Sequence, residues 1–144
     1  MILHAGLIAL RRRRDWAGVL IRGPSGSGKS DLALRAIAEG FQLVADDRTL
    51  VFLSRGQPFG RAPPTLHGLI EARGLGVLRH IALPVASIVL SVQCKKTPQE
   101  VERLPDARTE SMLGVEVPTL DLWPFEHTAP AKIRRAIEHL GVRP

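Results

Sequence analysis

The stretch GPSGSGKS, residues 23–30, spaces its glycines, its lysine and its final hydroxyl in the pattern GxxxxGK followed by Ser or Thr. This pattern is typical of a loop that binds nucleotide phosphates, because its glycines permit positive φ angles and turn backbone amides toward oxygen anions. Lys29 would place its charge on the β and γ phosphates, and the Ser30 hydroxyl would bind the accompanying magnesium ion. The residues that we expect around the phosphates are Gly23, Pro24, Ser25, Gly26, Ser27, Gly28, Lys29 and Ser30.

The sequence on either side of the loop supports this interpretation. The apolar run AGVLI, residues 17–21, predicts a strand before the loop, and DLALRAIAE, residues 31–39, predicts a helix that begins at it. The N-terminus of a helix carries partial positive charge and therefore adds to the attraction for an anion. The alternative, a glycine-rich turn without a ligand, requires the motif and its context to agree by chance.

Carboxylates follow the loop at two places in the chain. Asp46 and Asp47 come directly after the predicted strand FQLVA, where a strand end can face the nucleotide. The segment LHGLIEARGLGVL, residues 66–78, carries Glu71 and Arg73 and contains too many glycines for a helix. On their own, these residues could equally belong to an ordinary turn and a surface loop. The phosphate motif favours a role in chemistry for the aspartates, and the glycine-rich segment is typical of a binding loop.

Length and composition predict one compact domain. The chain has 144 residues, of which 44% are hydrophobic and 24% are charged. That composition supplies a core large enough to fold alone, so we expect a single domain over residues 1–144. The fold class that we expect is α/β, with a central mixed sheet flanked by helices and the phosphate loop at a strand end.

Charge and cysteine content limit the partners and the location that we expect. The net charge of +6 and the run Arg11–Arg14 favour anionic partners. Aromatic residues make up 4% of the chain, so we do not expect binding to single-stranded nucleic acid by base stacking. The lone Cys94 lies in an apolar run and is expected to be a core thiol. Without a membrane-spanning run or a secretory signal, we expect no membrane partner and a cytoplasmic location.

Periodicity and turn residues predict the elements that hold these groups. Strands are expected over residues 2–10, 16–21, 48–53, 57–62, 83–94 and 113–124, with an arginine hairpin tip between the first two. A short helical turn from Pro98 and a loop should precede the last strand, and Thr128 should cap a final helix. Gly40 and Gly141 are expected to end the two helices.

These segments together resemble the bacterial HPr kinase/phosphorylase family, phosphate-loop enzymes that phosphorylate a serine of the phosphocarrier protein HPr. The matching segments are GPSGSGKS, LVADDR (43–48), LIEARGLGV (69–77), ERLPDA (102–107) and LGVEVP (113–118). LIEARGLGV together with LVADD is the most specific part, and the resemblance covers nearly the whole chain. It implies a P-loop kinase domain similar to the C-terminal domain of the family, in a short form that contains only the catalytic domain.

The resemblance implies a role for each candidate residue. The implied catalytic residues are Asp47, His4, Lys29 and Arg103, and the implied magnesium ligands are Ser30 and Glu71. Asp46 is expected at the same metal site, as an aid to the metal or to the base. Asp47 would accept the proton of the target serine with His4 beside it, and Arg103 would stabilise charge on the phosphoryl group in transfer. The implied cofactors are ATP and Mg²⁺, and the implied partner is HPr or an HPr-like carrier. A homo-oligomer is one assembly that we allow for.

Two segments depart from the family pattern. The insertion RRRRDW lengthens the hairpin between His4 and the phosphate loop, which makes the assignment of His4 less secure than that of Asp47. Residues 124–129 read PFEHTA where the family carries PVRPGR, an arginine-bearing segment associated with dephosphorylation. We therefore expect kinase activity with weak or absent phosphorylase activity.

The function that we expect is an ATP-dependent serine kinase acting on HPr or an HPr-like carrier. One alternative is a small-molecule kinase on the same loop, with an acceptor pocket built by the second half of the chain. Transfer of labelled phosphate to different acceptors separates these two. The other alternative is a non-catalytic regulatory module whose basic hairpin grips nucleotide or RNA phosphates, and steep salt-dependent RNA binding without transfer would identify it.

Overall fold

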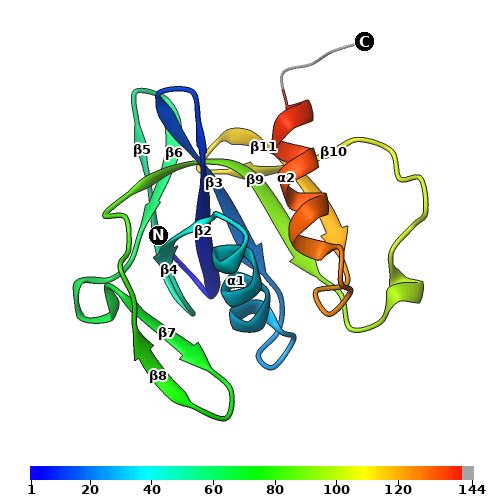
Figure 1. The fold of residues 1–144 in the computed structure, drawn as a ribbon. Helices are drawn as coiled ribbons and strands as arrows, with labels where there is room; N and C mark the ends of the chain where they lie inside the picture. Colours follow the sequence, from blue (N-terminus) through cyan, green and yellow to red (C-terminus); the bar gives the residue numbers. More distant parts are fainter. Residues whose placement is uncertain (141–144) are drawn as a thin grey trace.

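Most strands of this protein follow the apolar runs of its sequence (Figure 1). The structure is a computed structural model that describes residues 1–140, so the predicted helix end at Gly141 lies outside the described residues. In chain order the elements are β1 (Ile2–Leu3), β2 (Ala5–Arg12), β3 (Asp15–Arg22), α1 (Lys29–Ala38), β4 (Gln42–Ala45), β5 (Thr49–Ser54), β6 (Gln57–Arg61), β7 (Leu69–Ala72), β8 (Gly76–Arg79), β9 (Ala86–Cys94), β10 (Arg108–Met112), β11 (Val115–Leu122) and α2 (Ala129–His139). Short 3-10 turns cover Pro64–Leu66 and Pro98–Glu100.

Nine strands of the described residues form one mixed sheet, which confirms the predicted central mixed sheet. Its main path runs β1, β5, β6, β9, β3, β2 and β4. The β10–β11 hairpin joins this path through β11, which pairs with the second half of β9. β3, β9 and β11 are parallel to one another, and the other pairings are antiparallel. The three parallel strands therefore end at one edge of the sheet.

The predicted arginine hairpin is confirmed between β2 and β3. Arg12 lies opposite Asp15, and Arg13 takes a positive φ of 57° in the turn between them. The single strand predicted over residues 2–10 is instead two strands, because the chain bends at His4. β1 then pairs with β5, while β2 continues into the hairpin.

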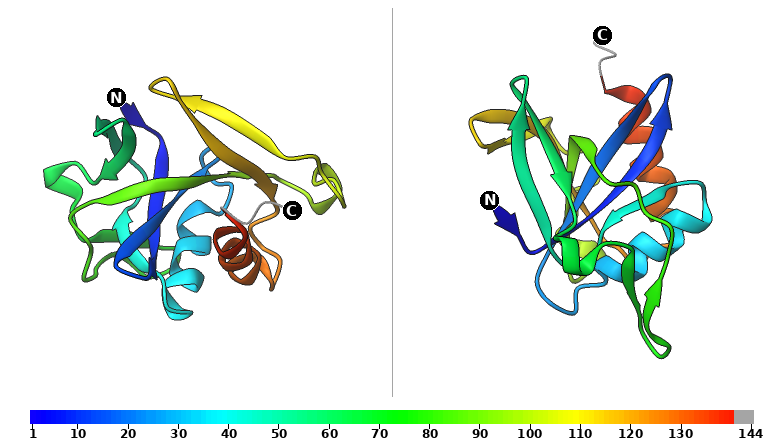
Figure 2. Two further views of the ribbon diagram at one scale, coloured as in Figure 1. Left: turned by 90° about the horizontal axis from the view of Figure 1, so that it is seen from above. Right: turned by 90° about the vertical axis from the view of Figure 1, so that its left-hand side faces the viewer.

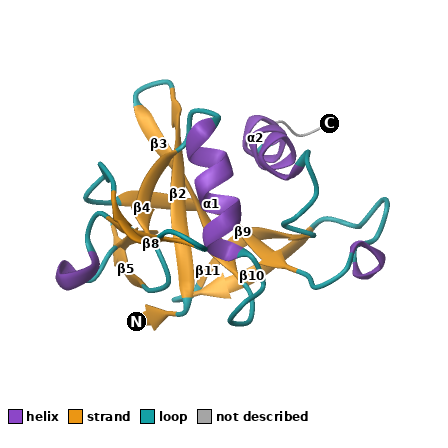
Figure 3. Ribbon diagram, turned by 60° about the horizontal axis from the view of Figure 1, so that its bottom comes forward, coloured by secondary structure: helices purple, strands orange, loops and turns teal. Residues whose placement is uncertain are grey.

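The sheet separates two groups of buried side chains. Both helices cover one face, where Leu32 of α1 and Ile133 of α2 pack with strand residues such as Val19. Figures 2 and 3 show the two helices side by side against this face. On the opposite face, Leu20 and residues of β5 and the β10–β11 hairpin form the second group. Burial of apolar side chains on both faces fixes the central strands, and with them the ends that carry the site.

Two predicted loops contain strands. Residues 69–79 form a separate antiparallel hairpin, β7–β8, that projects from the domain, whereas the sequence predicted a loop (Figures 1 and 2). Only Ile70 and Ala72 of the hairpin are buried, and β8 is exposed throughout. Residues 108–112 form β10, which pairs with β11 and was also predicted as loop. In the described residues 1–140, no helix is long and apolar enough to span a membrane.

Candidate active site

The parallel strands deliver three segments to one edge of the sheet. β3 ends at Arg22, directly before the phosphate loop, while β9 ends at Cys94 and β11 ends at Leu122. The antiparallel strand β2 begins at the same edge, since Ala5 lies opposite Arg22. Ligands of open α/β sheets bind outside the carboxyl ends of the parallel strands. The phosphate loop, the segment after β11 and the turn at His4 therefore surround one candidate site.

The predicted phosphate loop, residues 23–30, curls back on itself before α1. Its turn is closed by a hydrogen bond of 3.1 Å from the Ser27 amide to the Pro24 carbonyl, and Gly26 and Gly28 take φ angles of 77° and 100°. The Lys29 ammonium donates hydrogen bonds of 2.6 Å and 3.0 Å to the carbonyls of Gly23 and Pro24. The Lys29 ammonium thus lies over the loop backbone, at the N-terminus of α1. A cation at a helix N-terminus favours the binding of an oxygen anion.

A buried aspartate ties the loop to two other segments. The Ser30 hydroxyl donates a hydrogen bond of 2.7 Å to Oδ1 of Asp46, and the Glu71 amide donates one of 2.9 Å to Oδ2. Asp46 is only 7% exposed, so its carboxylate depends on these donors. Three sequence-predicted ligand positions thus meet, although Glu71 contributes its backbone and its side chain is exposed.

Asp47 and His4 occupy neighbouring turns at the same edge. Asp47 is exposed, takes a positive φ of 68°, and lies 3.8 Å from the Arg48 guanidinium through Oδ2. Leu3 pairs with Thr49, and the Thr49 hydroxyl donates to the Ala5 carbonyl at 2.8 Å, so the chain on either side of His4 is held next to the Asp47 turn. No hydrogen bond joins the His4 and Asp47 side chains in the described part of the chain.

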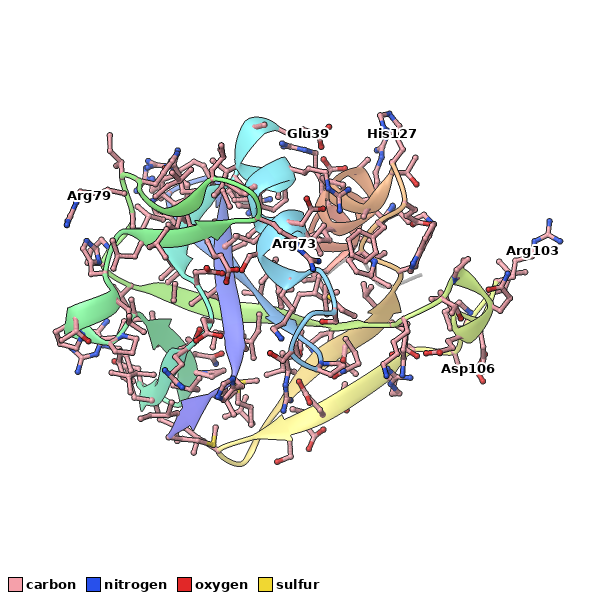
Figure 4. All side chains as sticks on the ribbon, turned by 90° about the horizontal axis from the view of Figure 1, so that it is seen from below. Glu39, Arg73, Arg79, Arg103, Asp106 and His127 are labelled. Carbon is pink, nitrogen blue, oxygen red and sulfur yellow. The ribbon has the colours of Figure 1, made fainter. Side chains whose placement is uncertain are left out.

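Arg103 lies apart from these residues. Arg103 is exposed on the loop between β9 and β10, and Figure 4 shows its side chain pointing away from the domain. Arg73 is exposed at the turn of the β7–β8 hairpin (Figure 4). The structure therefore does not bring the predicted catalytic arginine to the phosphate loop, and its role stays a prediction.

The segment after β11 packs directly on the phosphate loop, which the sequence did not predict. A Cβ atom built on Gly28 would lie 2.7 Å from Cζ of Phe125, so the ring sits against the loop backbone. The Arg35 guanidinium of α1 donates to the carbonyls of Pro124 and Glu126, on either side of Phe125. The signal available in the sequence is the run WPF at the end of the predicted strand 113–124.

Cys94 lies beside the loop as a buried, neutral group. It is 2% exposed, and burial raises the pKa of its thiol to about 11, although the nearby Lys29 charge acts in the opposite direction. At neutral pH the side chain is therefore a thiol rather than a thiolate, and it is not a nucleophile. The predicted core role of Cys94 is confirmed.

Comparison with known proteins shows the family of this chain. The model of the HPr Serine kinase C-terminal domain family matches residues 14–133. The chain belongs to this family. The HPr kinase/phosphorylase of Burkholderia cenocepacia (strain HI2424) is 40% identical over 111 residues, which cover 69% of this chain and 34% of that protein. The HPr kinase/phosphorylase of Paraburkholderia phymatum gives the same values, so the chain spans about a third of the length of these curated relatives.

The fold comparison agrees with the family. A solved structure described as the Hpr(Ser) kinase/phosphatase from Coxiella burnetii matches with a TM-score of 0.81 at 26% identity, over 99% of this chain and 91% of that chain. The resemblance to HPr kinases that the motifs indicated is thereby confirmed, together with the mixed α/β fold. In this member of the HPr kinase family, the Ser30–Asp46 hydrogen bond joins the start of α1 to the segment after β4.

Proposed function

We propose that this HPr kinase domain transfers the γ phosphate of ATP to a serine hydroxyl of HPr or an HPr-like carrier, in the cytoplasm. The observation that carries the proposal is the hydrogen bond of 2.7 Å between Ser30, in the first turn of α1, and Asp46, after β4. This hydrogen bond supports a metal site beside the predicted phosphate loop, because it brings together two oxygen atoms that could bind a metal, and Asp47 is the next residue. Phosphoryl transfer needs a phosphate cradle, a metal, cations and one base.

ATP would bind with its phosphates in the loop of residues 23–30. The Lys29 ammonium already lies over the loop carbonyls of Gly23 and Pro24, 2.6 Å and 3.0 Å away. A phosphate in the loop would offer this cation stronger acceptors than neutral carbonyls, because charge-assisted hydrogen bonds are roughly twice as strong. The positive end of α1 adds to the attraction.

The residues at the loop fit a magnesium ion. Magnesium in nucleotide sites is held by one or two protein oxygens together with substrate phosphates and water, and Ser30 Oγ with Asp46 Oδ1 supplies such a pair. Among the described residues no group of three or more His, Cys, Asp or Glu side chains could hold a metal, which fits an ion bound jointly with phosphate. When bound, the ion would neutralise charge on the phosphate oxygens.

Asp47 is the proposed base. Its carboxylate follows the buried Asp46 directly but is exposed, so an acceptor hydroxyl can approach it from solvent. His4, exposed on the neighbouring turn, is proposed to assist it. Arg103 is proposed as the cation for the transferring phosphoryl group on the strength of the family resemblance alone.

The open position of Asp47 favours a protein acceptor over a small molecule. The Asp47 side chain is 59% exposed, as expected for a base that meets a serine on another protein's surface. A cavity of about 750 Å³ is lined by Arg12, Trp16 and Leu140, at the hairpin end of β3 and away from Lys29. It therefore does not supply an acceptor pocket beside the phosphate loop. Incubation with labelled ATP and either HPr or small hydroxylated metabolites tests this choice, and label on the metabolites alone would overturn it.

Glu71→Gln should raise the magnesium concentration needed for half-maximal phosphotransfer by about tenfold. The backbone N–H of Glu71 donates to Asp46, so the Glu71 side chain begins next to the proposed ion site. The side-chain amide of Gln is a weaker magnesium ligand than the carboxylate of Glu. The measurement is phosphotransfer over a magnesium titration. Glu100→Gln, an exposed carboxylate on the 3-10 turn after β9, is the matched control. An unchanged curve for Glu71→Gln would leave its side chain as a surface group.

Phosphorolysis of the serine-phosphorylated carrier should be at least about tenfold slower than the forward reaction. Attack of inorganic phosphate on phosphoserine brings two anions together and needs positioned cations. The segment 124–129 holds no arginine or lysine, and its Glu126 engages the Lys132 ammonium at 2.5 Å. That pair offers no free cation. Pyrophosphate release from purified phosphocarrier with excess phosphate measures the reaction, and equal forward and reverse rates would show that other arginines fill the role.

A further inference from the structure

An exposed aromatic ring lies against the phosphate loop. The Phe125 side chain is 51% exposed, although phenylalanine is normally buried. The end of its ring faces the loop, since Cζ, Cε1 and Cε2 would all lie within 3.2 Å of a Cβ on Gly28. Only glycine leaves room for this contact. The ring therefore reaches the loop with its tip and leaves a large part of its surface open to solvent.

The ring is held in place by its neighbours. Arg35 donates to the carbonyls on both sides of Phe125, and Lys132 pairs with Glu126 at 2.5 Å, so the segment is fastened to α1 and to α2. Trp123 stands edge-on to Phe125, with ring centroids 6.4 Å apart and an interplanar angle of 70°. An exposed ring held this firmly loses little further entropy when it contacts a ligand.

The position of the ring matches the part of a nucleotide that extends from the loop. The segment of Phe125 leaves the sheet from β11, whose carboxyl end lies at the same edge as that of β3. Phosphates held by the loop amides would place the nucleoside outside the loop, beside the first turn of α1. The chemistry of that part is an aromatic base, and bases stack on exposed aromatic side chains without needing specific hydrogen bonds.

We propose that Phe125, backed by Trp123, is the stacking platform for the base of the bound nucleotide. This rests on the proposed binding of ATP to the loop, and it adds a base subsite built by the segment 123–127. Stacking on a ring favours the larger surface of a purine and discriminates little between adenine and guanine. The subsite therefore accepts ATP and GTP with similar affinity and binds UTP more weakly.

The test compares ATP with inorganic tripolyphosphate, which carries the phosphates without a base. Dissociation constants in magnesium are measured for wild type, Phe125→Ala and Phe125→Tyr. We expect Phe125→Ala to raise the dissociation constant of ATP about tenfold and to leave that of tripolyphosphate within about twofold of wild type. Phe125→Tyr should restore ATP binding. Phe52→Ala, a partly exposed phenylalanine on β5, is the control and should change neither ligand. Thermal melts confirm that each variant folds.

A second readout uses the indole beside the ring. Trp16→Phe leaves Trp123 as the only tryptophan, and its emission should change on binding ATP but not tripolyphosphate. Three results for Phe125→Ala would overturn the proposal. Equal weakening of both ligands would mean that the ring supports the loop, and no change in either would mean that the ring plays no part in binding. Tighter tripolyphosphate binding would mean that the ring covers the loop. Lys29→Ala tests the phosphate site separately from the base subsite. If that variant binds both ligands normally, the proposed phosphate site is wrong.

Discussion

Asp47→Asn should slow phosphate transfer to serine by about 10²- to 10⁴-fold and leave ATP affinity within about twofold. The amide cannot accept the hydroxyl proton, whereas the phosphate loop, Lys29 and the Ser30–Asp46 pair remain in place. Asn is the right replacement because Asp47 takes a φ of 68°, a left-handed conformation that Asn adopts at least as readily as Asp. Transfer is measured as initial rate with saturating carrier, and affinity by equilibrium binding of ATP.

The control for this experiment is Asp106→Asn, which removes an exposed carboxylate from the loop between β9 and β10 (Figure 4). It should change neither rate nor affinity. If Asp47→Asn turns over at a near-normal rate, Asp47 is not the base. If it loses ATP affinity as strongly as rate, the side chain acts on the nucleotide rather than on the acceptor.

Lys29→Ala should weaken both binding and catalysis. The ammonium lies at the loop, where we propose that it meets the phosphates in the ground state and in the transition state. The variant should therefore lose about 10- to 100-fold in ATP affinity and a further factor in turnover. Titration of ATP followed by single-turnover kinetics separates the two effects. The contrast with Asp47→Asn is the diagnostic result, because one change affects rate alone and the other affects both.

Lys95→Ala serves as the control for Lys29→Ala. Lys95 follows β9 at the same sheet edge, but its ammonium lies 3.9 Å from Asp121. Its removal should have a small effect on nucleotide affinity, because it keeps the loop intact and a partly exposed ion pair at 3.9 Å contributes little. Retained affinity and rate in Lys29→Ala would contradict the assignment of residues 23–30 as a phosphate loop.

Elements with a strong local pattern were predictable from the sequence. The glycine-rich turn of residues 23–28 follows from its glycine spacing, and α1 follows from the helical repeat of Leu32, Ala33 and Ala36, all of which are buried. β9 follows from its continuous apolar run, which is typical of a strand covered on both faces. These signals lie within a few residues of one another, so they need no knowledge of the tertiary structure.

Exposed strands were not predictable in the same way. β8 is exposed along its length, and β10 buries only Met112, so neither shows an alternating pattern. Their pairing depends on partners, such as β11 for β10, and on the ion pair of 2.6 Å that joins Glu110 to Arg22 at the end of β3. Such contacts link residues far apart in the chain, and one sequence does not reveal them.

The candidate site was predicted in its parts rather than in its arrangement. Ser30 and Asp46 were assigned to magnesium separately, and the structure adds the hydrogen bond between them. The contact of Phe125 with Gly28 arises because β3 and β11 end at the same edge, which depends on strand order. The position of Arg103 depends on the course of a long loop and could not be inferred from its motif.

Mass spectrometry of the carrier after incubation with this protein, ATP and magnesium tests the central claim most directly. The substrate is the HPr-like protein of the same host, and Asp47→Asn and Lys29→Ala run in parallel. Our account predicts one phosphoserine on the carrier that forms with the wild-type chain and is lost or greatly reduced with both variants. A carrier that stays unmodified while ATP phosphate passes to water or a small molecule, or a phosphoserine that forms equally well with both variants, would contradict it.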